Sequence, residues 1–230
     1  MRGIVLAGGT GSRLGSLTKA VNKHLMPVGN QPMIYWPIKI LRDNNIDDIT
    51  IVSSARGVGQ LAEALGGKFN YRVQDGPGGV AQALYCATVR HEESVAVILG
   101  DNVFLPGPKI TIEAVSARCF LHSSPFHNLT QFGVPILNEC GRIVEIIEKP
   151  NVPSTAYAVT GLYVFSGEVF RRIKHLQSSQ RGELEITDLL NTYAHAGSLT
   201  HTIVDGFWGD AGTLKGMAIC NEMVAKMEKQ

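Results

Sequence analysis

The stretch GIVLAGGTGSRL (residues 3–14) joins an apolar run to a cluster of glycines near the start of the chain. The run Ile4–Ala7 is apolar and predicts a short buried strand. It leads into a loop that holds Gly8, Gly9 and Gly11. Glycines at a strand end let the backbone approach a ligand closely, and the exposed N–H groups of such loops commonly bind an anion. The stretch therefore predicts an anion site at the carboxyl end of the first strand.

The rest of the chain alternates short apolar runs with longer amphipathic segments. In the first half, strands are predicted over residues 48–54, 68–74 and 94–101, and helices over 33–44, 58–67 and 79–90. In the second half, strands are predicted over residues 142–149, 156–167 and 199–208, and helices over 183–197 and 213–230. This order predicts an α/β fold with a mixed, mostly parallel sheet flanked by helices. Because no clean boundary interrupts the chain, we predict one Rossmann-like domain over residues 1–230.

Composition excludes several classes of protein. The chain of 230 residues is 44% hydrophobic and 18% charged, which is ordinary for a globular protein. Its formal net charge of +1, with no run of Lys or Arg, gives no case for binding nucleic acid. The four cysteines form no C-x-x-C pair, so neither a zinc site nor a disulfide framework is indicated. No run approaches the roughly 20 apolar residues of a membrane span, and we predict a cytoplasmic protein without a membrane partner.

The glycine loop matches neither common phosphate-binding fingerprint. In the pattern G-x-G-x-x-G, Leu14 stands at the third glycine, and in G-x-x-x-x-G-K-[ST], Ser16 stands in place of the lysine. A lone glycine-rich turn is often only structural. Arg13 and Lys23 strengthen the hypothesis, since two fixed cations beside a loop of backbone donors suit a polyphosphate, although either cation alone could be a solvated surface charge.

Two aspartates follow apolar strands and are candidate ligands for Mg²⁺. The apolar run Val95–Leu99 delivers Asp101 to the same sheet edge as the glycine loop, and Asp210 lies in the later segment GFWGDAGT. Such an aspartate can simply cap a helix or a turn. Alternatively, one or two carboxylates can hold Mg²⁺ together with phosphate oxygens at a nucleotide site.

Nine ordered motifs, spread from Gly3 to about Thr213, resemble those of the sugar-nucleotide nucleotidyltransferases: LAGGTGSRL, KHLMP, GGVAQAL, LGDN, FGVP, EKP, AVTGLY, RGELEITD and WGDAGT. The resemblance implies a single nucleotidyltransferase domain, with a triphosphate-binding half of about residues 1–115 and a sugar-phosphate-binding half of about 116–230. It implies transfer of dTMP from dTTP to a sugar 1-phosphate, expected to be glucose 1-phosphate, with Mg²⁺ as cofactor and pyrophosphate as the second product.

The resemblance also implies roles for individual residues. The implied nucleotide site consists of Leu6, Gly8, Gly9, Gly11, Ser12, Arg13, Gln74, Gly79, Gln82 and Asp101. The implied sugar-phosphate site consists of Gly133, Glu148, Lys149, Val159, Gly161 and Arg181, with Thr160 as a neighbour. The implied catalytic residues are Arg13, Lys23 and Lys149, and the implied metal ligands are Asp101 and Asp210. Gln74 is expected to select the base, because an amide offers both a donor and an acceptor to a pyrimidine edge.

This chemistry needs positioning and charge neutralisation rather than a protein nucleophile, so the lack of a Ser/His/Asp or Cys/His set does not count against it. Gln131 stands where relatives often carry a basic residue, and Gly15-Ser16 replaces a frequent aromatic-Pro pair. These departures leave the exact substrate open.

Three alternative functions make different demands on the sequence. The enzyme could use UTP or CTP, with another sugar 1-phosphate or a phosphorylated alcohol. A dinucleotide-binding oxidoreductase should show a third glycine and an acid about 20 residues past the turn, and this chain shows neither. A non-catalytic regulatory homologue should have lost Arg13, Lys23 or a metal aspartate, and all are kept.

We expect a homo-oligomer. Longer family members continue into helices that help form a regulatory nucleotide site, so a chain ending at Gln230 leads us to expect hyperbolic kinetics.

Overall fold

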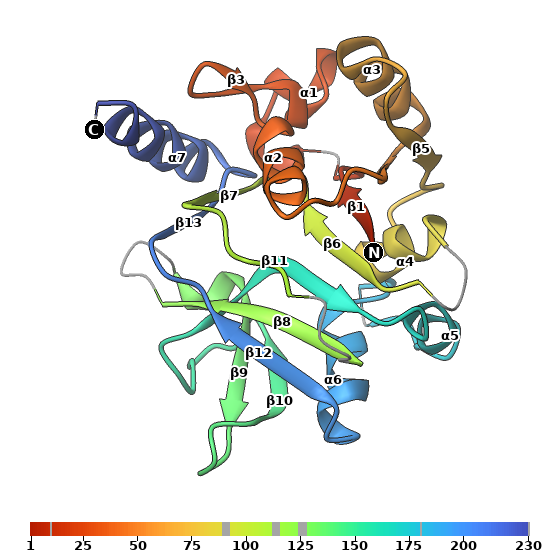
Figure 1. The fold of residues 1–230 in the computed structure, drawn as a ribbon, viewed down its shortest axis with the longest axis vertical. Coiled ribbons are helices and arrows are strands. Elements are labelled where there is room, and N and C mark those ends of the chain that lie inside the picture. Colours follow the sequence, from red (N-terminus) through yellow and green to blue (C-terminus); the bar gives the residue numbers. More distant parts are fainter. Residues whose placement is uncertain (10, 89–92, 112–115, 124–127, 180, 230) are drawn as a thin grey trace.

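The computed structural model describes all residues except 10, 89–92, 112–115, 124–127, 180 and 230. A central sheet of seven strands crosses the molecule in the order β12-β8-β11-β6-β1-β4-β5 (Figure 1). Its strands are β1 (Arg2–Leu6), β4 (Ile49–Ser53), β5 (Asn70–Val73), β6 (Val95–Leu99), β8 (Ala117–His122), β11 (Ala158–Phe165) and β12 (Leu199–Ile203). All neighbouring pairs are parallel except that β11 runs antiparallel to both β6 and β8. The predicted α/β fold with a mixed, mostly parallel sheet is confirmed.

Helices cover both faces of this sheet because successive side chains of a buried strand point to opposite sides. On β1, Ile4 and Leu6 belong to one core cluster, whereas Val5, together with Ala7 just after the strand, belongs to the other. The first cluster is covered by α4 (Gly79–Cys86), α5 (Val169–Ile173) and α6 (Ile186–His195). The second is covered by α2 (Tyr35–Asp43) and α3 (Ala55–Leu65). A strand buried on both faces reads as a continuous apolar run, which is the pattern seen at the start of the chain.

A small ribbon continues from the central sheet. It pairs β7 (Asn102–Leu105) with β13 (Phe207–Asp210) in antiparallel register, so that Asp210 lies opposite Asn102. Only Gly100 and Asp101 separate β6 from β7. Helix α7 (Leu214–Met227) follows β13 and packs on this ribbon (Figure 1). No helix in the described ranges is long and apolar enough to cross a bilayer.

A second small ribbon packs against helix α6 and contacts strands β11 and β12. It consists of β9 (Gly133–Leu137) and β10 (Ile143–Glu148), which pair antiparallel. Asn191 of α6 fastens β10 by accepting a hydrogen bond from the Ile146 N–H at 2.8 Å and donating one to its carbonyl at 2.9 Å. The remaining short elements are β2 (Pro27–Val28), β3 (Gln31–Pro32), α1 (Leu17–Ala20) and 3₁₀ turns at Ser12–Leu14, Lys23–Leu25 and Leu129–Gln131.

Several predicted boundaries were wrong. The single strand predicted over 199–208 is two strands, β12 and β13, which lie in different sheets because the chain turns at Gly206, with φ +81°. The helix predicted over 58–67 begins at Ala55, because the Ser54 hydroxyl caps it by accepting from the Gly57 N–H. The helix predicted over 79–90 ends at Cys86, and residues 89–90 lie outside the described part. Strands β7, β8 and β9 were not predicted.

Candidate active site

The glycine loop after β1 folds around the side chain of Lys23. A Cβ on Gly9 would lie 3.1 Å from both Cε and Nζ of Lys23. Gly11 has φ +69°, and a Cβ there would lie 2.6 Å from Thr18 and 3.3 Å from the Lys23 Cβ. The side chain of Ser12 lies outside the described part of the structure. Part of the reason for glycine in this loop is therefore its close packing on Lys23, which is held directly beneath it.

Lys23 forms a buried ion pair with Asp101. The ammonium Nζ donates to Asp101 Oδ2 at 2.5 Å, and the two side chains are only 8% and 12% exposed. Burial alone would raise the pKa of the Asp101 carboxyl, but Lys23 and then His24 outweigh burial and hold this pKa well below its usual range. Asp101 is therefore ionised at neutral pH and lies at the carboxyl edge of the sheet, as predicted.

Asp210 approaches Asp101 from the ribbon. The Ala211 N–H donates to the Asp101 carbonyl at 2.8 Å, which ties the end of β13 to the turn after β6. A Cβ on Gly212 would lie 2.7 Å from Asp101 Oδ2 and 2.8 Å from Asp210 Oδ1. Burial, followed by the negative charge of Asp101, raises the pKa of Asp210 to about 6. The two predicted metal ligands thus face one shared space. This space stays open because glycine at position 212 has no Cβ to fill it.

This arrangement fits a divalent cation. Carboxylate oxygens are the ligands that Mg²⁺ prefers, and at nucleotide sites it usually takes one or two of them plus phosphate oxygens. The described residues contain no cluster of three or more His, Cys, Asp or Glu side chains placed to hold a metal ion. Asp101 and Asp210 could therefore hold Mg²⁺ only together with oxygens from a phosphate or water, which is the situation expected at a nucleotide site.

His24 packs beneath the turn that presents Asp101. It is fully buried, its Nδ1 lies 2.8 Å from Asn22 Oδ1, and a Cβ on Gly100 would lie 2.6 Å from its ring. Burial, then the charge of Lys23, lowers the pKa of His24 to about 3, against the opposing effect of Asp101. The ring is therefore neutral at neutral pH, and its role is structural.

His24 should make the stability of the fold depend on pH. The unfolded chain takes up a proton near pKa 6.5, whereas the folded protein does so only near 3. The contribution of His24 to stability is complete above pH 6.5 and is lost as pH falls toward 3, with a slope of up to about 1.4 kcal/mol per pH unit. In urea unfolding of metal-free protein, the free energy of unfolding should fall less steeply below pH 6.5 for His24→Gln than for wild type. The exposed His195→Gln is the control, and an unchanged slope in His24→Gln would contradict this account.

Gln74 follows β5 and lies against the glycine loop, but its amide is already committed. Its Nε2 donates to the Gly79 carbonyl at 3.1 Å and to Gln82 Oε1 at 3.0 Å. Because a backbone carbonyl can only accept, these bonds fix which end of the amide carries the hydrogens. Oε1 then faces Gly8, where any Cβ would collide with it. In this structure only the acceptor of Gln74 remains for a base, and its role in selecting the base stays a prediction.

Gly79 is required for a reason that the sequence does not show. Its φ is +87°, and a Cβ there would lie 2.5 Å from the Leu184 carbonyl oxygen. This carbonyl accepts from the Ala81 N–H at 3.0 Å, and the Leu184 N–H donates to the Gly78 carbonyl at 2.8 Å. The start of α4 is thereby joined to the segment before α6. A contact between Gly79 and the base stays a prediction.

The sugar-phosphate residues gather around Glu148, at the end of β10. Its Oε2 accepts from the Thr187 hydroxyl at 2.6 Å, while its Oε1 lies 2.9 Å from Lys149 Nζ and 3.7 Å from Arg181 Nη2. A Cβ on Gly133 would lie 3.7 Å from Glu148 Oε2. Arg181 also pairs with Glu185 at 2.9 Å. Gly133, Glu148, Lys149 and Arg181 are therefore brought together from separate segments, and their role in binding a sugar phosphate stays a prediction.

The start of β11 links this group to the metal candidates. The Gly161 N–H donates to Asn102 Oδ1 at 3.0 Å, and the Trp208 indole N–H donates to the same oxygen at 2.6 Å. A Cβ on Gly161 would lie 2.7 Å from Asn102 Oδ1, so only glycine allows this approach. Val159 lies two residues earlier on the same strand and is buried. Because β11 is antiparallel to β6, its first residues lie at the edge where Asp101 stands.

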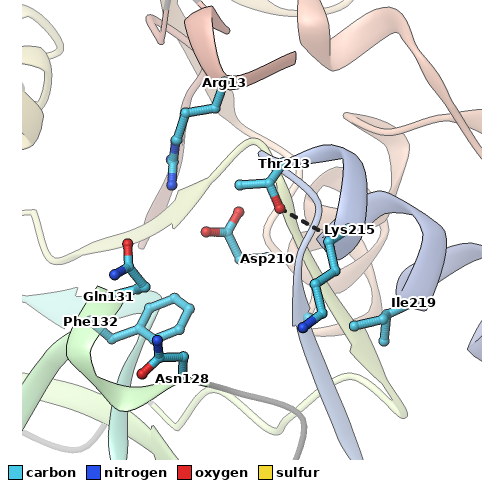
Figure 2. Close-up of a pocket in the computed structure, with 10 residues that line it drawn as sticks. Arg13, Asn128, Gln131, Phe132, Asp210, Thr213, Lys215 and Ile219 are labelled. Atoms are coloured by element: carbon cyan, nitrogen blue, oxygen red, sulfur yellow. Dashed lines mark hydrogen bonds between the residues drawn. The ribbon is translucent and has the colours of Figure 1, made fainter.

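A pocket of about 210 Å³ opens beside Asp210 (Figure 2). Its walls include Arg13, Phe132, Asp210 and Thr213, which the motifs contain, and several residues that sequence reasoning missed: Asn128, Lys215, Gly216 and Ile219. The missed residues come from the turn before β9 and from α7. No local pattern marks them, because they meet the motif residues only through folding.

Known proteins share this fold and much of the sequence. Residues 2–226 match the profile of the family described as Nucleotidyl transferase. Curated relatives include glucose-1-phosphate thymidylyltransferases of Neisseria meningitidis (38% identical; 93% of this chain, 78% of that protein) and Mycobacterium tuberculosis (34% identical; 100% and 84%). A low-salt glycan biosynthesis nucleotidyltransferase of Haloferax volcanii is 33% identical over 97% of this chain, which spans 66% of that relative.

Solved structures of related proteins share the fold of this chain. A crystal structure of a provisionally named glucose-1-phosphate thymidylyltransferase from Bacillus anthracis, in complex with sucrose, superposes with a TM-score of 0.87. The two sequences are 42% identical, and the match covers 97% of this chain and 94% of that one. A UDP-glucose pyrophosphorylase with bound UDP-glucose has a TM-score of 0.82 but only 20% identity, so it shows the shared fold alone. The family profile matches residues 2–226 of this chain, and curated relatives are more than 30% identical to it. The chain therefore belongs to the nucleotidyl transferase family of enzymes.

Proposed function

We propose that this protein transfers dTMP from dTTP to glucose 1-phosphate and releases pyrophosphate. The observation that carries the proposal is the convergence of Lys23, Asp101 and Asp210 beneath the glycine loop. A buried cation and two facing carboxylates at the carboxyl edge of an α/β sheet suit a triphosphate with its metal ion. The names of the relatives, glucose-1-phosphate thymidylyltransferases among them, support the choice of substrates.

The reaction follows from the charges at the site. An oxygen of the sugar 1-phosphate attacks the α-phosphorus of dTTP, the bond from that phosphorus to the oxygen bridging to the β-phosphate breaks, and pyrophosphate leaves. Lys149 holds the attacking phosphate, and Glu148 accepts hydrogen bonds from sugar hydroxyls. Arg13 and Lys23 bind the triphosphate and stabilise charge in the transition state. Mg²⁺, held by Asp101 and Asp210, would neutralise phosphate charge when bound.

Base selection is predicted to rest on the acceptor of Gln74. Thymine and uracil present an N3–H donor to Oε1, whereas cytosine presents an acceptor at N3 and leaves both groups unpaired. We therefore expect kcat/KM for CTP to be at least about 10²-fold below that for dTTP. UTP should be poorer than dTTP but detectable, because the thymine methyl contributes only about 1 kcal/mol. ATP and GTP should be poor substrates.

Kinetics with glucose 1-phosphate and each triphosphate measure this selectivity. Gln82→Glu is the matched control, because it keeps an acceptor for Gln74 Nε2 and should preserve the preference for dTTP. Gln82→Met removes that acceptor and should bring the kcat/KM values for dTTP and CTP closer together. Equal turnover of dTTP and CTP by the wild type would show that Gln74 does not read the base.

A pyrophosphate-release assay over a matrix of nucleoside triphosphates and sugar 1-phosphates tests the function as a whole. The highest rate is expected for dTTP with glucose 1-phosphate. A higher rate with UTP would instead support a uridylyltransferase, which the same Gln74 acceptor allows. No release with any pair, at saturating Mg²⁺, would count against the enzyme and favour a regulatory homologue.

A further inference from the structure

We propose that Lys215 binds the pyrophosphate that leaves the reaction, acting with Arg13 across the pocket beside Asp210. The inference rests on the proposed function and adds a residue to its leaving-group side. Lys215 is the second residue of α7, and it lines the pocket together with Arg13 and Asp210. No sequence motif pointed to Lys215.

The geometry of the pocket places two cations on opposite walls. Figure 2 shows Arg13 reaching in from the loop after β1, Lys215 extending from α7, and Asp210 between them. The polar side chains of Asn128, Gln131 and Thr213 complete the walls. Arg13 and Lys215 are both exposed, so each is free to move toward an incoming anion.

Among the described residues, the side chains of Arg13 and Lys215 have no ion-pair partner, unlike the other cations of the site. Lys23 is paired with Asp101, Lys149 with Glu148, and Arg181 with Glu148 and Glu185. By contrast, neither Arg13 nor Lys215 forms an ion pair in the part of the chain that the structure describes. Among the described residues that line it, the pocket therefore presents two cations outside any ion pair and one carboxylate, that of Asp210. Such a surface favours a small polyanion.

The position of the pocket favours the leaving group over the attacking one. In an in-line displacement the leaving oxygen departs on the side of the phosphorus opposite to the attacking oxygen. The pocket is lined by Arg13 and Asp210, to which the proposed function gives triphosphate and metal roles, and on another side by Phe132, whose carbonyl accepts from the Lys149 N–H at 3.0 Å. Because neither Glu148 nor the Lys149 side chain lines the pocket, an anion bound between Arg13 and Lys215 fits pyrophosphate better than the attacking phosphate.

The reverse reaction isolates this contact, because pyrophosphate is then a substrate. With dTDP-glucose as the second substrate, Lys215→Ala should raise KM for pyrophosphate roughly tenfold, the factor for one charge-assisted contact, and leave KM for dTDP-glucose unchanged. Lys215→Arg keeps the charge and should restore most of the affinity. Lys226→Ala is the matched control, since Lys226 lies on the same helix but pairs with Glu222. An unchanged KM for pyrophosphate in Lys215→Ala would overturn the inference.

Calorimetric titration with inorganic pyrophosphate and Mg²⁺, without nucleotide or sugar, separates this inference from the proposed function. Weaker binding by Lys215→Ala than by wild type supports the inference even if no sugar 1-phosphate proves to be a substrate. Equal binding by the two proteins overturns it, even if the wild type makes dTDP-glucose at a high rate.

Discussion

Asp210→Asn is expected to lower turnover by about 10³-fold or more while leaving the protein at least as stable as wild type. The activity falls because one of two carboxylates facing the space beside Gly212 loses its charge. Stability behaves differently. Burial and Asp101 raise the pKa of Asp210 from 3.8 to about 6, so ionised Asp210 destabilises the metal-free fold. Its favourable effect is complete below pH 3.8 and is lost as pH rises through about 6.

Thermal unfolding of metal-free protein checks this asymmetry. Above about pH 7, Asp210→Asn should melt at or above the wild-type temperature, and the difference should vanish near pH 4. Adding Mg²⁺ with a nucleoside triphosphate should stabilise the wild type and not the variant. The exposed Asp205→Asn, close to Asp210 in the chain, is the control and should match the wild type in every measurement.

Asp101→Asn should lose activity to a similar degree but should also lose stability. In the wild type, Lys23 Nζ lies 2.5 Å from Asp101 Oδ2. The change therefore leaves the ammonium of Lys23 buried without its carboxylate partner. A buried charge deprived of its partner is costly. Near-normal rates in either aspartate variant at saturating Mg²⁺ would overturn the metal assignment. Equal loss of stability in both variants would overturn the account of their charges.

Arg13→Ala is expected to lower kcat by about 10²-fold or more, with little effect on KM for the sugar phosphate. The guanidinium faces the pocket beside Asp210, where the pyrophosphate is expected to leave (Figure 2). It therefore meets charge that grows as the reaction proceeds, and interactions of this kind appear in kcat rather than in ground-state binding.

Steady-state kinetics of Arg13→Ala, with Lys19→Ala as control, measure the effect. Lys19 is an exposed cation a few residues further along the chain, and its removal should change neither constant. If Arg13→Ala raised only KM for the sugar 1-phosphate, Arg13 would belong to the other half of the site. The double variant Arg13→Ala, Lys215→Ala should lose more pyrophosphate affinity than either single variant.

The α/β fold could be predicted because its main signals are local. A short apolar run such as Val95–Leu99 favours a buried strand, and helical spacing in residues 33–44 was enough to predict α2. β8 was missed because Arg118 and His122 interrupt its apolar pattern, although all six of its residues are buried. The strand predicted over 199–208 was wrong because periodicity cannot show that a turn at Gly206 sends the chain into another sheet.

The sequence by itself determined the family, the order of the motifs and the candidate residues, since these depend only on which side chains follow one another. Only the tertiary structure decided how those side chains act. The Lys23–Asp101 pair and the raised pKa of Asp210 each depend on segments far apart in the chain, and the amide of Gln74 is committed by the turn into α4. The approach of Lys215 to the Arg13 pocket is of the same kind. Charge interactions and desolvation depend on distances and burial, and packing sets both.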